Sequence, residues 1–493
     1  MLLTFLFYGV PGWESASMPA ASPGWKQVNQ DGFVKNFTPD ATGMGTNLVA
    51  FDNQLYAANI NGLFHLEDPL TQVWTAWIPG NPPSGPGPAP SLLPLDNFLY
   101  AYSNDQIWFW ASGTNPRDVQ TGWHAVTSLG LPGGVSPVPK VLFNSRIYGV
   151  YTSLSGAFEI WRTANIGVAT ATWEQVAAGS LGDTTNHTGV DLMIVYSNRI
   201  LLGIRSLGTG SFGDPHIYGT GVEIWESATG NSGSWSQVNV NGFGTLYSGC
   251  VSGVCNFAIH QMLGSAMTYR PVGASQEYLY VGTLSHFGAE IFRYDGSGLG
   301  GWTNVTQPWA GQCGLGCTGP GRNHSMAVYQ GSLYVAEGYP KANLSRYDGS
   351  NWSIVEAGPN PFSASNIRLV DLELFQGRLF VSTAALGGNP GDQVWGFPFY
   401  GNGTTDLLHR QFIISNVTSP ETERYTPAVA FNTNHREYLV AWQNLWLSGQ
   451  KDIYARRVDS DTGAHIRWII ITEGLYSRIQ PALAFGATND EYL

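Results

Sequence analysis

Apolar and polar residues alternate in short stretches along most of the chain, and a tight turn interrupts each stretch. An apolar strand leads into a turn of Asn, Asp, Ser, Gln or Gly, and a second strand then opens with aliphatic or aromatic residues. Such turn residues tolerate the positive φ angles that two-residue hairpin turns require. The pattern predicts seven β-hairpins, which begin near residues 48, 92, 141, 193, 269, 326 and 372.

A tryptophan strand is the second recurring element. The tryptophan is followed two or three residues later by an aliphatic residue, usually Val, and then by Gly or Pro. Several units also carry a third strand, as in "GAFEIWR" from residue 156 and "GVEIWES" from residue 221. Each unit of about 50 residues therefore holds four short strands, which is the content of one propeller blade. The tryptophans are Trp25, Trp77 (the weakest match), Trp123, Trp173, Trp235, Trp302 and Trp352.

The start of the chain resembles the last strand of a unit, although it comes before the first hairpin. "GWKQVNQDGF" at 24–33 resembles "SWSQVNVNGF" at 234–243, whereas the last hairpin, near residue 372, has no tryptophan strand after it. We therefore expect residues 24–33 to supply the outer strand of the last unit, so that no sheet edge is left open. The prediction is an all-β fold in which residues 24–400 form a seven-bladed β-propeller closed by the N-terminal strand.

A different repeat begins near residue 401. "PAVAFNTNHREYL" at 427–439 returns as "PALAFGATNDEYL" at 481–493, 54 residues later. Repeat arrays need several stacked units to bury their apolar faces. We expect residues 401–493 to form an incomplete second β-repeat domain that continues in a longer polypeptide beyond Leu493.

Composition narrows the classes of partner. Only 12% of the 493 residues are charged and the net charge is −12, which argues against nucleic acid and anionic lipid as partners. No apolar run is long enough to span a membrane, and "LLTFLFYGV" at 2–10 has the length of a signal-peptide core without basic residues before it. We expect residues 1–23 to be a signal-like or disordered start and the protein to be secreted or on the cell surface, with no membrane insertion.

Four cysteines form two close pairs, Cys250 with Cys255 and Cys313 with Cys317. Zinc is one interpretation, but paired zinc thiolates usually lie two residues apart. Disulfides in an oxidising compartment are favoured instead. Local bridges and bridges across the fifth blade both remain open, and local bridges are preferred. The sequence predicts no metal site and no cofactor.

Loops that interrupt the repeat carry the candidate binding site, because a rigid scaffold usually presents its variable chemistry in loops. The loops between units share one face of a propeller with the loops that join second and third strands. Side chains gathered there suit hydrogen bonding and stacking on a sugar or a peptide. They are Asp214, His216, Tyr218, His286, Arg322 and His324.

Catalytic residues are not assigned. Glu159, Glu223 and Glu290 recur at matching positions of successive units, and so do most of the arginines. Acid and base catalysis needs two carboxyl groups in unlike environments, whereas repeated positions share one environment. The recurrence therefore favours a scaffold role for these residues.

The units resemble secreted β-propellers of the broad kelch and sialidase-like (Asp-box) kind, although "SRYDGSNW" at 345–352 spaces its Ser and Asp differently from an Asp-box. The tail, with "EYLVAW" and "DIYARRVD", resembles repeats of large bacterial surface proteins. These resemblances and the loop face together favour a secreted or cell-surface binding and adhesion scaffold for a glycan or protein ligand. The alternative is an extracellular glycan-processing enzyme, a glycoside hydrolase or sialidase-like protein, that uses the same face.

Overall fold

The computed structural model describes residues 24–29, 46–59, 62–68, 73–77, 91–113, 123–131, 136–152, 158–178, 181, 187–206, 220–251, 254–285, 289–307, 321–338, 342–357, 366–385, 393–399, 421–446, 451–459, 465–472, 485–486 and 491–492, except 53, 104, 376, 433 and 436. The chain divides into an N-terminal unit, Pro23–Phe399, and a C-terminal unit that includes Tyr400–Leu493.

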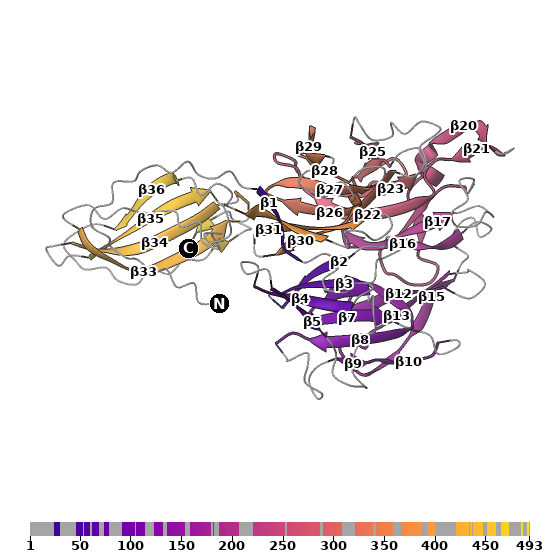
Figure 1. Ribbon diagram of the computed structural model, residues 1–493, viewed down its shortest axis with the longest axis horizontal. Coiled ribbons are helices and arrows are strands. Elements are labelled where there is room, and N and C mark those ends of the chain that lie inside the picture. Colours follow the sequence, from indigo (N-terminus) through magenta and orange to yellow (C-terminus); the bar gives the residue numbers. More distant parts are fainter. Residues whose placement is uncertain are drawn as a thin grey trace. The chain divides into compact units, whose positions relative to one another are not determined.

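Nearly all regular structure in these residues is β, with a single short 3-10 turn at Asn241–Gly244 (Figure 1). The prediction of an all-β protein is confirmed. Within the described ranges, no helix has the length and apolar character needed to cross a membrane.

Seven four-stranded antiparallel repeats make up the N-terminal unit, and in each of them consecutive strands pair. Repeats 1 to 4 are β2 (Asn47–Phe51), β3 (Gln54–Asn59), β4 (Gly62–Asp68) and β5 (Val73–Trp77); β6 (Ser91–Leu95), β7 (Phe98–Ser103), β8 (Gln106–Ala111) and β9 (His124–Ala125); β11 (Val138–Phe143), β12 (Arg146–Thr152), β13 (Phe158–Thr163) and β15 (Glu174–Ala178); and β16 (His187–Tyr196), β17 (Arg199–Ser206), β18 (Glu223–Ser227) and β19 (Ser236–Gln237).

Short pairings between the end of one repeat's second strand and the start of the next repeat's first strand join repeats 5 to 7 into one 12-stranded sheet. They are β22 (Met262–Tyr269), β23 (Tyr278–Ser285), β24 (Ile291–Tyr294) and β25 (Trp302–Asn304); β26 (Gly321–Tyr329), β27 (Ser332–Gly338), β28 (Asn343–Tyr347) and β29 (Trp352–Ala357); and β30 (Asn366–Phe375), β31 (Arg378–Ala385), β32 (Gln393–Phe399) and β1 (Gly24–Gln27). Two short pairs lie outside the repeats: β10 (Thr127–Leu129) with β14 (Thr170–Thr172), and β20 (Leu246–Val251) with β21 (Val254–Ala258).

All seven predicted hairpins are present, and two of their turns show the expected backbone clearly. Asn144 and Ser145 have φ of 48° and 57°, and Ser197 and Asn198 have φ of 49° and 56°. Positive φ at both central residues defines a type I′ turn, whose twist matches the twist of the flanking strands. The short polar residues at these positions therefore determine the hairpin register.

Hydrophobic clusters form between each repeat and the next, where the apolar faces of adjacent sheets meet. One cluster packs Tyr148 and Ile160 of repeat 3 against Ile200 of repeat 4. Another packs Phe380 of repeat 7 against Leu55 of repeat 1. The first strands of the seven repeats contact one another in cyclic order. Each contacts the first strands of the repeats before and after it, and β30 of repeat 7 contacts β2 of repeat 1.

The N-terminal segment pairs with the last repeat in the way its sequence suggested. β1 runs antiparallel to β32, with Gly24 opposite Phe399. The Asn29 side-chain oxygen accepts the backbone N–H of Val394 at 2.6 Å, and the Asn239 oxygen accepts that of Ile224 at 2.6 Å. The repeated asparagine therefore makes the same hydrogen bond to the third strand in repeats 7 and 4.

Three tryptophan strands are linked to the preceding repeat by the same hydrogen bond. The indole N–H of Trp302 donates to the carbonyl of Val238 in the preceding repeat at 2.7 Å, and Trp74 donates to Val28 at 2.8 Å. Trp352 makes the same bond to Val305 at 2.6 Å, whereas Trp173 donates to the Ser128 hydroxyl at 3.2 Å. In repeat 1 the donor is Trp74, on the same strand as the predicted Trp77, whose side chain is not among those described.

The C-terminal unit contains a four-stranded antiparallel sheet of β33 (Glu421–Asn432), β34 (Glu437–Trp446), β35 (Lys451–Asp459) and β36 (His465–Thr472). A second, short hairpin follows, formed by β37 (Phe485–Gly486) and β38 (Glu491–Tyr492). On the four-stranded sheet, Leu439, Ala441 and Ala455 form a buried apolar cluster, and Tyr492 of the hairpin packs against it.

Candidate functional site

Most of the predicted site residues lie outside the described residues, namely Asp214, His216, Tyr218 and His286. Arg322 and His324 lie on β26, where only their backbone is described. Ser285, the residue before His286, pairs with Gly321, the residue before Arg322. The topology thus brings these two parts of the predicted site to one sheet edge, and the binding role of all six residues stays a prediction.

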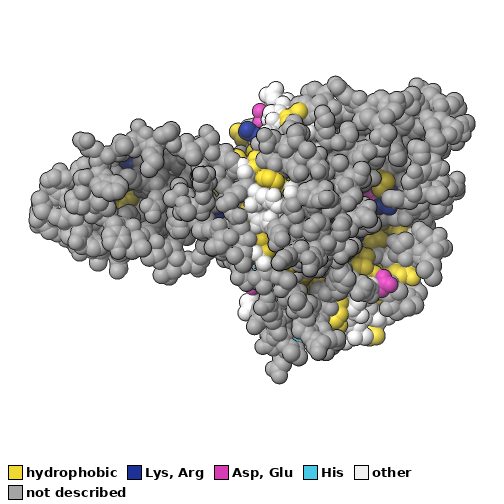
Figure 2. All heavy atoms as spheres, viewed as in Figure 1, with side chains coloured by type: hydrophobic (Ala, Val, Ile, Leu, Met, Phe, Trp, Pro, Cys, Tyr) yellow, Lys and Arg dark blue, Asp and Glu magenta, His cyan; other side chains and the backbone are white. Residues whose placement is uncertain are grey.

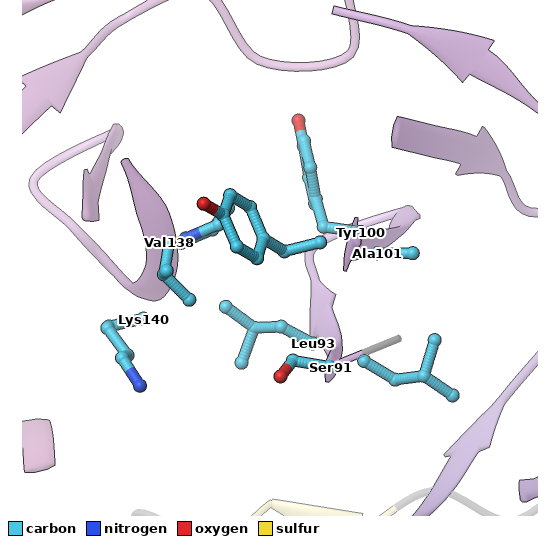
Figure 3. A pocket seen from close by; sticks show the side chains of 9 residues that line it. Ser91, Leu93, Tyr100, Ala101, Val138 and Lys140 are labelled. Atoms are coloured by element: carbon cyan, nitrogen blue, oxygen red, sulfur yellow. The ribbon is translucent and has the colours of Figure 1, made fainter. Parts of the chain in front are cut away.

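A cavity of about 150 Å³ lies between repeats 2 and 3. In Figure 3, Lys140 and Val138 approach it from one side and Ser91 and Leu93 from the other, while the Tyr100 ring points away from Lys140. Its lining residues come from β6, β7 and β11: Ser91, Leu92, Leu93, Tyr100, Ala101, Tyr102, Val138, Pro139 and Lys140.

The cavity lies at the end of the sheets where the loop face was predicted. Ser91 begins β6 and pairs with Tyr102 near the end of β7. Lys140 lies in the first half of β11. The start of each first strand adjoins the loop from the preceding repeat. The end of each second strand adjoins the loop that leads to the third strand. The cavity therefore lies at the same end of its repeats as the predicted loop face, and its residues Ser91 and Lys140 are not among the predicted site residues.

Lys140 is the basic group of the cavity. It lies where the β11–β12 register shifts between Pro139 and Val141, and such irregularities re-aim side chains. Burial lowers the pKa of Lys140, while the Asp191 carboxylate opposes this change. Within the described part of the chain, no hydrogen bond or ion pair of the Lys140 ammonium is found.

Asp191, on β16 of the next repeat, also lies at a register shift. Its side chain is 3% exposed and accepts hydrogen bonds from Nε of Arg205 at 2.7 Å and from the backbone N–H of Leu263 at 2.8 Å. Burial raises the pKa of Asp191, and Arg205 and Lys140 act against that rise. Two basic groups thus accompany one buried acid, which leaves a surplus of positive charge beside the cavity.

The volume of the cavity limits what it can hold. Sites that enclose a whole small molecule usually measure about 300–1,000 Å³, whereas a cavity of about 150 Å³ holds a group the size of a benzene ring. One side chain or one sugar substituent fits. The size and the charge together suit a carboxylate that projects from a larger ligand.

A second buried charged cluster lies on β30 of repeat 7. The Asp371 carboxylate accepts hydrogen bonds from the backbone N–H of Leu48 at 2.9 Å, the Asn47 side chain at 2.7 Å and the Ser325 hydroxyl at 2.8 Å. Burial raises the pKa of Asp371, and these donors oppose the rise. Because Leu48 belongs to repeat 1 and Ser325 to repeat 6, one carboxylate joins three repeats.

Glu373 is the second acid of this cluster and accepts the backbone N–H of Ala50 at 3.1 Å. Burial and the nearby charge of Asp371 raise the pKa of Glu373 to about 8. Neither carboxyl group lines the described cavity. The pair is therefore placed to join repeats rather than to meet a ligand there.

The recurring glutamates and arginines have structural partners within their own repeats. Glu159 accepts the Trp161 indole N–H at 2.8 Å, and Glu223 accepts the Trp225 indole N–H at 2.9 Å. Other acids bind the arginines, as in the 2.7 Å contact between Arg199 and Glu226. Glu159 and Glu223 thus share one environment, as expected from their recurrence. Glu290, at the matching position of repeat 5, differs: its carboxylate lies 2.9 Å from Nε2 of His260 and accepts the Asn304 side-chain N–H at 3.0 Å.

The first cysteine pair lies on a hairpin rather than in a loop. Cys250 on β20 is directly opposite Cys255 on β21, a register that suits a local bridge. Only the backbone of Cys250 and Cys255 is described, and Cys313 and Cys317 lie outside the described residues. Bridges therefore stay a prediction. The described ranges also contain no group of three or more His, Cys, Asp or Glu residues able to hold a metal ion.

The visible surface gives no second candidate. On the face shown in Figure 2, the described side chains are hydrophobic and uncharged polar groups with a few single acidic and basic ones among them. The described residues on that face form no extended charged patch, so the Lys140 cavity remains the best-defined candidate.

Comparison with known proteins adds little. Neither a protein-family model nor a curated protein sequence matches the chain. A structure of YCF48 bound to D1 peptide is 13% identical, with a TM-score of 0.41 over 79% of this chain and 99% of that chain. Extracellular domains 1–2 of Drosophila Semaphorin 1a are 12% identical, with a TM-score of 0.41 over 76% of this chain and 88% of that chain. The AfRom2 CNH domain is 10% identical, with a TM-score of 0.40 over 77% and 100% of the two chains. At these levels of similarity, we infer no function from them.

Proposed function

We propose that the N-terminal unit is a seven-bladed β-propeller closed by β1, and that it is the binding domain of a secreted or cell-surface adhesion protein. The cyclic order of contacts between first strands supports the ring, because it returns from β30 to β2. The hydrophobic cluster shared by Phe380 and Leu55 supports the same closure. In such a ring the first strands surround the axis, and their ends open on the loop face.

The observation that carries the binding role is the Lys140 ammonium beside a small cavity at that face. An ammonium without a protein partner among the described residues can bind an anion in place of water. The ligand is a glycan or a protein that inserts one carboxylate, either from an acidic sugar or from an acidic side chain. The predicted site residues Asp214, His216, Tyr218, His286, Arg322 and His324 stay part of the proposal as further contacts of the same ligand.

Binding is favoured over glycan hydrolysis because no carboxyl group lines the described cavity. Hydrolysis by the usual mechanism needs two carboxyl groups about 5–9.5 Å apart beside the scissile bond. The two neighbouring acids on β30 hold the N–H groups of an adjacent repeat instead.

Thermal denaturation with small carboxylates tests the proposal. Glucuronate and N-acetylglutamate should each raise the melting temperature in a saturable way, because a ligand that binds only the folded state stabilises it. Glucose, at the same ionic strength, should have no effect. The larger of the two shifts indicates whether a glycan or a protein is the natural ligand.

Lys140→Met should abolish the shift, and the matched control Lys451→Met, which removes the same charge from the C-terminal unit, should retain it. If neither carboxylate stabilises the protein, or if Lys140→Met responds like the natural protein, the cavity is not the binding site.

A further inference from the structure

Arg205 is a second basic residue close to Lys140. It lies near the end of β17, where its backbone pairs with Gly189, two residues before Asp191 on β16. β16 contacts β11, the strand that carries Lys140. Because first strands begin and second strands end at the predicted loop face, Lys140, Asp191 and Arg205 all lie toward that face.

Asp191 holds one edge of the Arg205 guanidinium. Nε of Arg205 donates to Oδ1 of Asp191 at 2.7 Å, and Nη2 donates to the same oxygen. The other oxygen, Oδ2, accepts the backbone N–H of Leu263 at 2.8 Å, so both oxygens of this buried carboxylate are occupied. A guanidinium is planar and rigid, so these contacts fix the direction of its remaining N–H groups.

The opposite edge of this guanidinium is available to a ligand. Among the residues that the structure describes, Nη1 of Arg205 makes no hydrogen bond, and the side chain is 29% exposed. Arg162 on β13 shows the contrast: its Nε donates to Glu174 at 3.0 Å and its Nη1 donates to the Asn231 side chain at 2.8 Å. Arg162 thus uses both edges within the protein, whereas Arg205 uses one.

The positive charges of Lys140 and Arg205 repel each other. Burial lowers the pKa of Lys140, the Asp191 carboxylate raises it, and the Arg205 charge lowers it again. Asp191 supplies a single negative charge, so one of the two positive charges is left unbalanced. A negative group that binds between the two cations removes this repulsion.

We propose that Arg205 is the second ligand-binding cation of this site, so that one carboxylate binds between Nζ of Lys140 and Nη1 of Arg205. The inference rests on the proposed binding role of the cavity and adds a preference to it. One negative charge balances the three groups, whereas a doubly charged phosphate group would place an excess negative charge next to the buried Asp191. The site should therefore prefer a carboxylate to a phosphate.

Thermal denaturation of variants tests the role of Arg205, with whichever of glucuronate and N-acetylglutamate stabilises the natural protein more. In Arg205→Gln, the ligand concentration that gives half of the maximal stabilisation should rise about tenfold, because a charge-assisted hydrogen bond is lost. Arg205→Lys keeps a positive charge beside Asp191 and so keeps the fold, but it should bind about threefold more weakly because lysine lacks the planar fork.

Arg199→Gln is the matched control. It removes an arginine from the other end of β17, where Nη1 of Arg199 binds Glu226 at 2.7 Å. The loss of positive charge and of an ion pair is the same as in Arg205→Gln, but this end of the strand is the hairpin end. The variant should therefore bind the carboxylate as the natural protein does.

Two phosphate analogues, glucose 6-phosphate and N-acetylphosphoserine, test the preference at pH 7.5, where a phosphate group is mostly doubly charged. At equal ionic strength, each should stabilise the natural protein less than the carboxylate that it replaces. Phosphate binding as tight as carboxylate binding would overturn the preference.

The remaining outcomes separate this inference from the proposed function. If both Arg205 variants bind the carboxylate as tightly as the natural protein while Lys140→Met does not bind it, Arg205 is not a ligand-binding residue and the Lys140 site stands. If neither carboxylate stabilises the natural protein, the proposed function fails and this inference fails with it.

Discussion

Two sets of charged groups lie on first strands of the N-terminal unit, and they use their hydrogen bonds differently. Asp371 accepts from Leu48, Asn47 and Ser325, so its carboxylate is saturated by neighbouring repeats. Lys140 lines an open cavity and has no hydrogen-bond partner among the described residues. A first strand can therefore hold a charged joint between repeats, as at Asp371, or a charged group beside a cavity, as at Lys140.

The difference comes from the number of donors around each group. A buried charge is tolerated only when partners replace the water that it loses. Repeat 1 supplies N–H groups to Asp371 and Glu373, whereas Lys140 retains access to the cavity. We infer that removing Asp371 harms stability and that removing Lys140 harms binding, and the following predictions test this contrast.

Deleting residues 1–34 should have the largest effect, because it removes β1 from the joint between repeats 7 and 1. The deletion exposes the edge of β32 and takes away the Val28 carbonyl that the Trp74 indole binds. We expect aggregation, or a melting temperature at least ten degrees lower. An unchanged melting curve would contradict the proposed closure of the ring.

Asp371→Ala should destabilise the N-terminal unit by about 3–5 kcal/mol, because it leaves several buried donors without an acceptor. Denaturant unfolding followed by tryptophan fluorescence measures the change. Asp371→Asn keeps the shape and one acceptor oxygen and should cost less. A loss below about 1 kcal/mol for Asp371→Ala would mean that the hydrogen bonds at this joint contribute little.

Glu373 should make stability fall as pH rises. Its pKa is about 8 in the folded protein and near 4.5 when unfolded, so the folded state holds the proton more tightly between these values. The contribution is complete below pH 4.5 and is lost as the pH passes 8. Between pH 4.5 and 8 the natural protein should lose unfolding free energy on the order of 3 kcal/mol through this group, and Glu373→Gln should not show this loss. The variant should therefore be the more stable of the two proteins at pH 9. Parallel slopes for the two proteins would exclude Glu373 as the cause.

Lys140→Met should change the free energy of unfolding least, by about 1 kcal/mol or less. Met replaces the aliphatic stem of the lysine, and the charge that is lost has no hydrogen-bond partner among the described residues. Denaturant unfolding at neutral pH gives this value for comparison with Asp371→Ala. A loss of unfolding free energy as large as that of Asp371→Ala would show that Lys140, like Asp371, stabilises the contact between repeats.

The hairpins could be predicted because local chemistry determines them. Short polar residues such as Asn144 and Ser145 adopt positive φ, and the apolar strands on either side then pair in one register. The role of residues 24–33 could also be read from the sequence, because the repeat lacked one strand at its end.

The cavity could not be predicted, because Ser91 and Lys140 come from different repeats and meet only when the sheets stack. A signal was nevertheless present. Lys140 is the one charged residue of its first strand, Val138–Phe143, and Asp191 directly precedes the apolar run 192–195, positions where a charge has a structural or functional reason to be buried. Neither is among the predicted site residues.

The pairing of β1 with β32 has a mechanical consequence. Gly24, at the start of β1, lies opposite Phe399, at the end of β32, so the chain enters and leaves the N-terminal unit at the same end of one strand pair. Tension applied between Gly24 and Phe399 would separate the two strands from one end, so that their hydrogen bonds break one after another rather than all together. If the proposed binding role is right, the protein should resist pulling better when the load enters through a ligand at the Lys140 cavity than when it enters through the N-terminus.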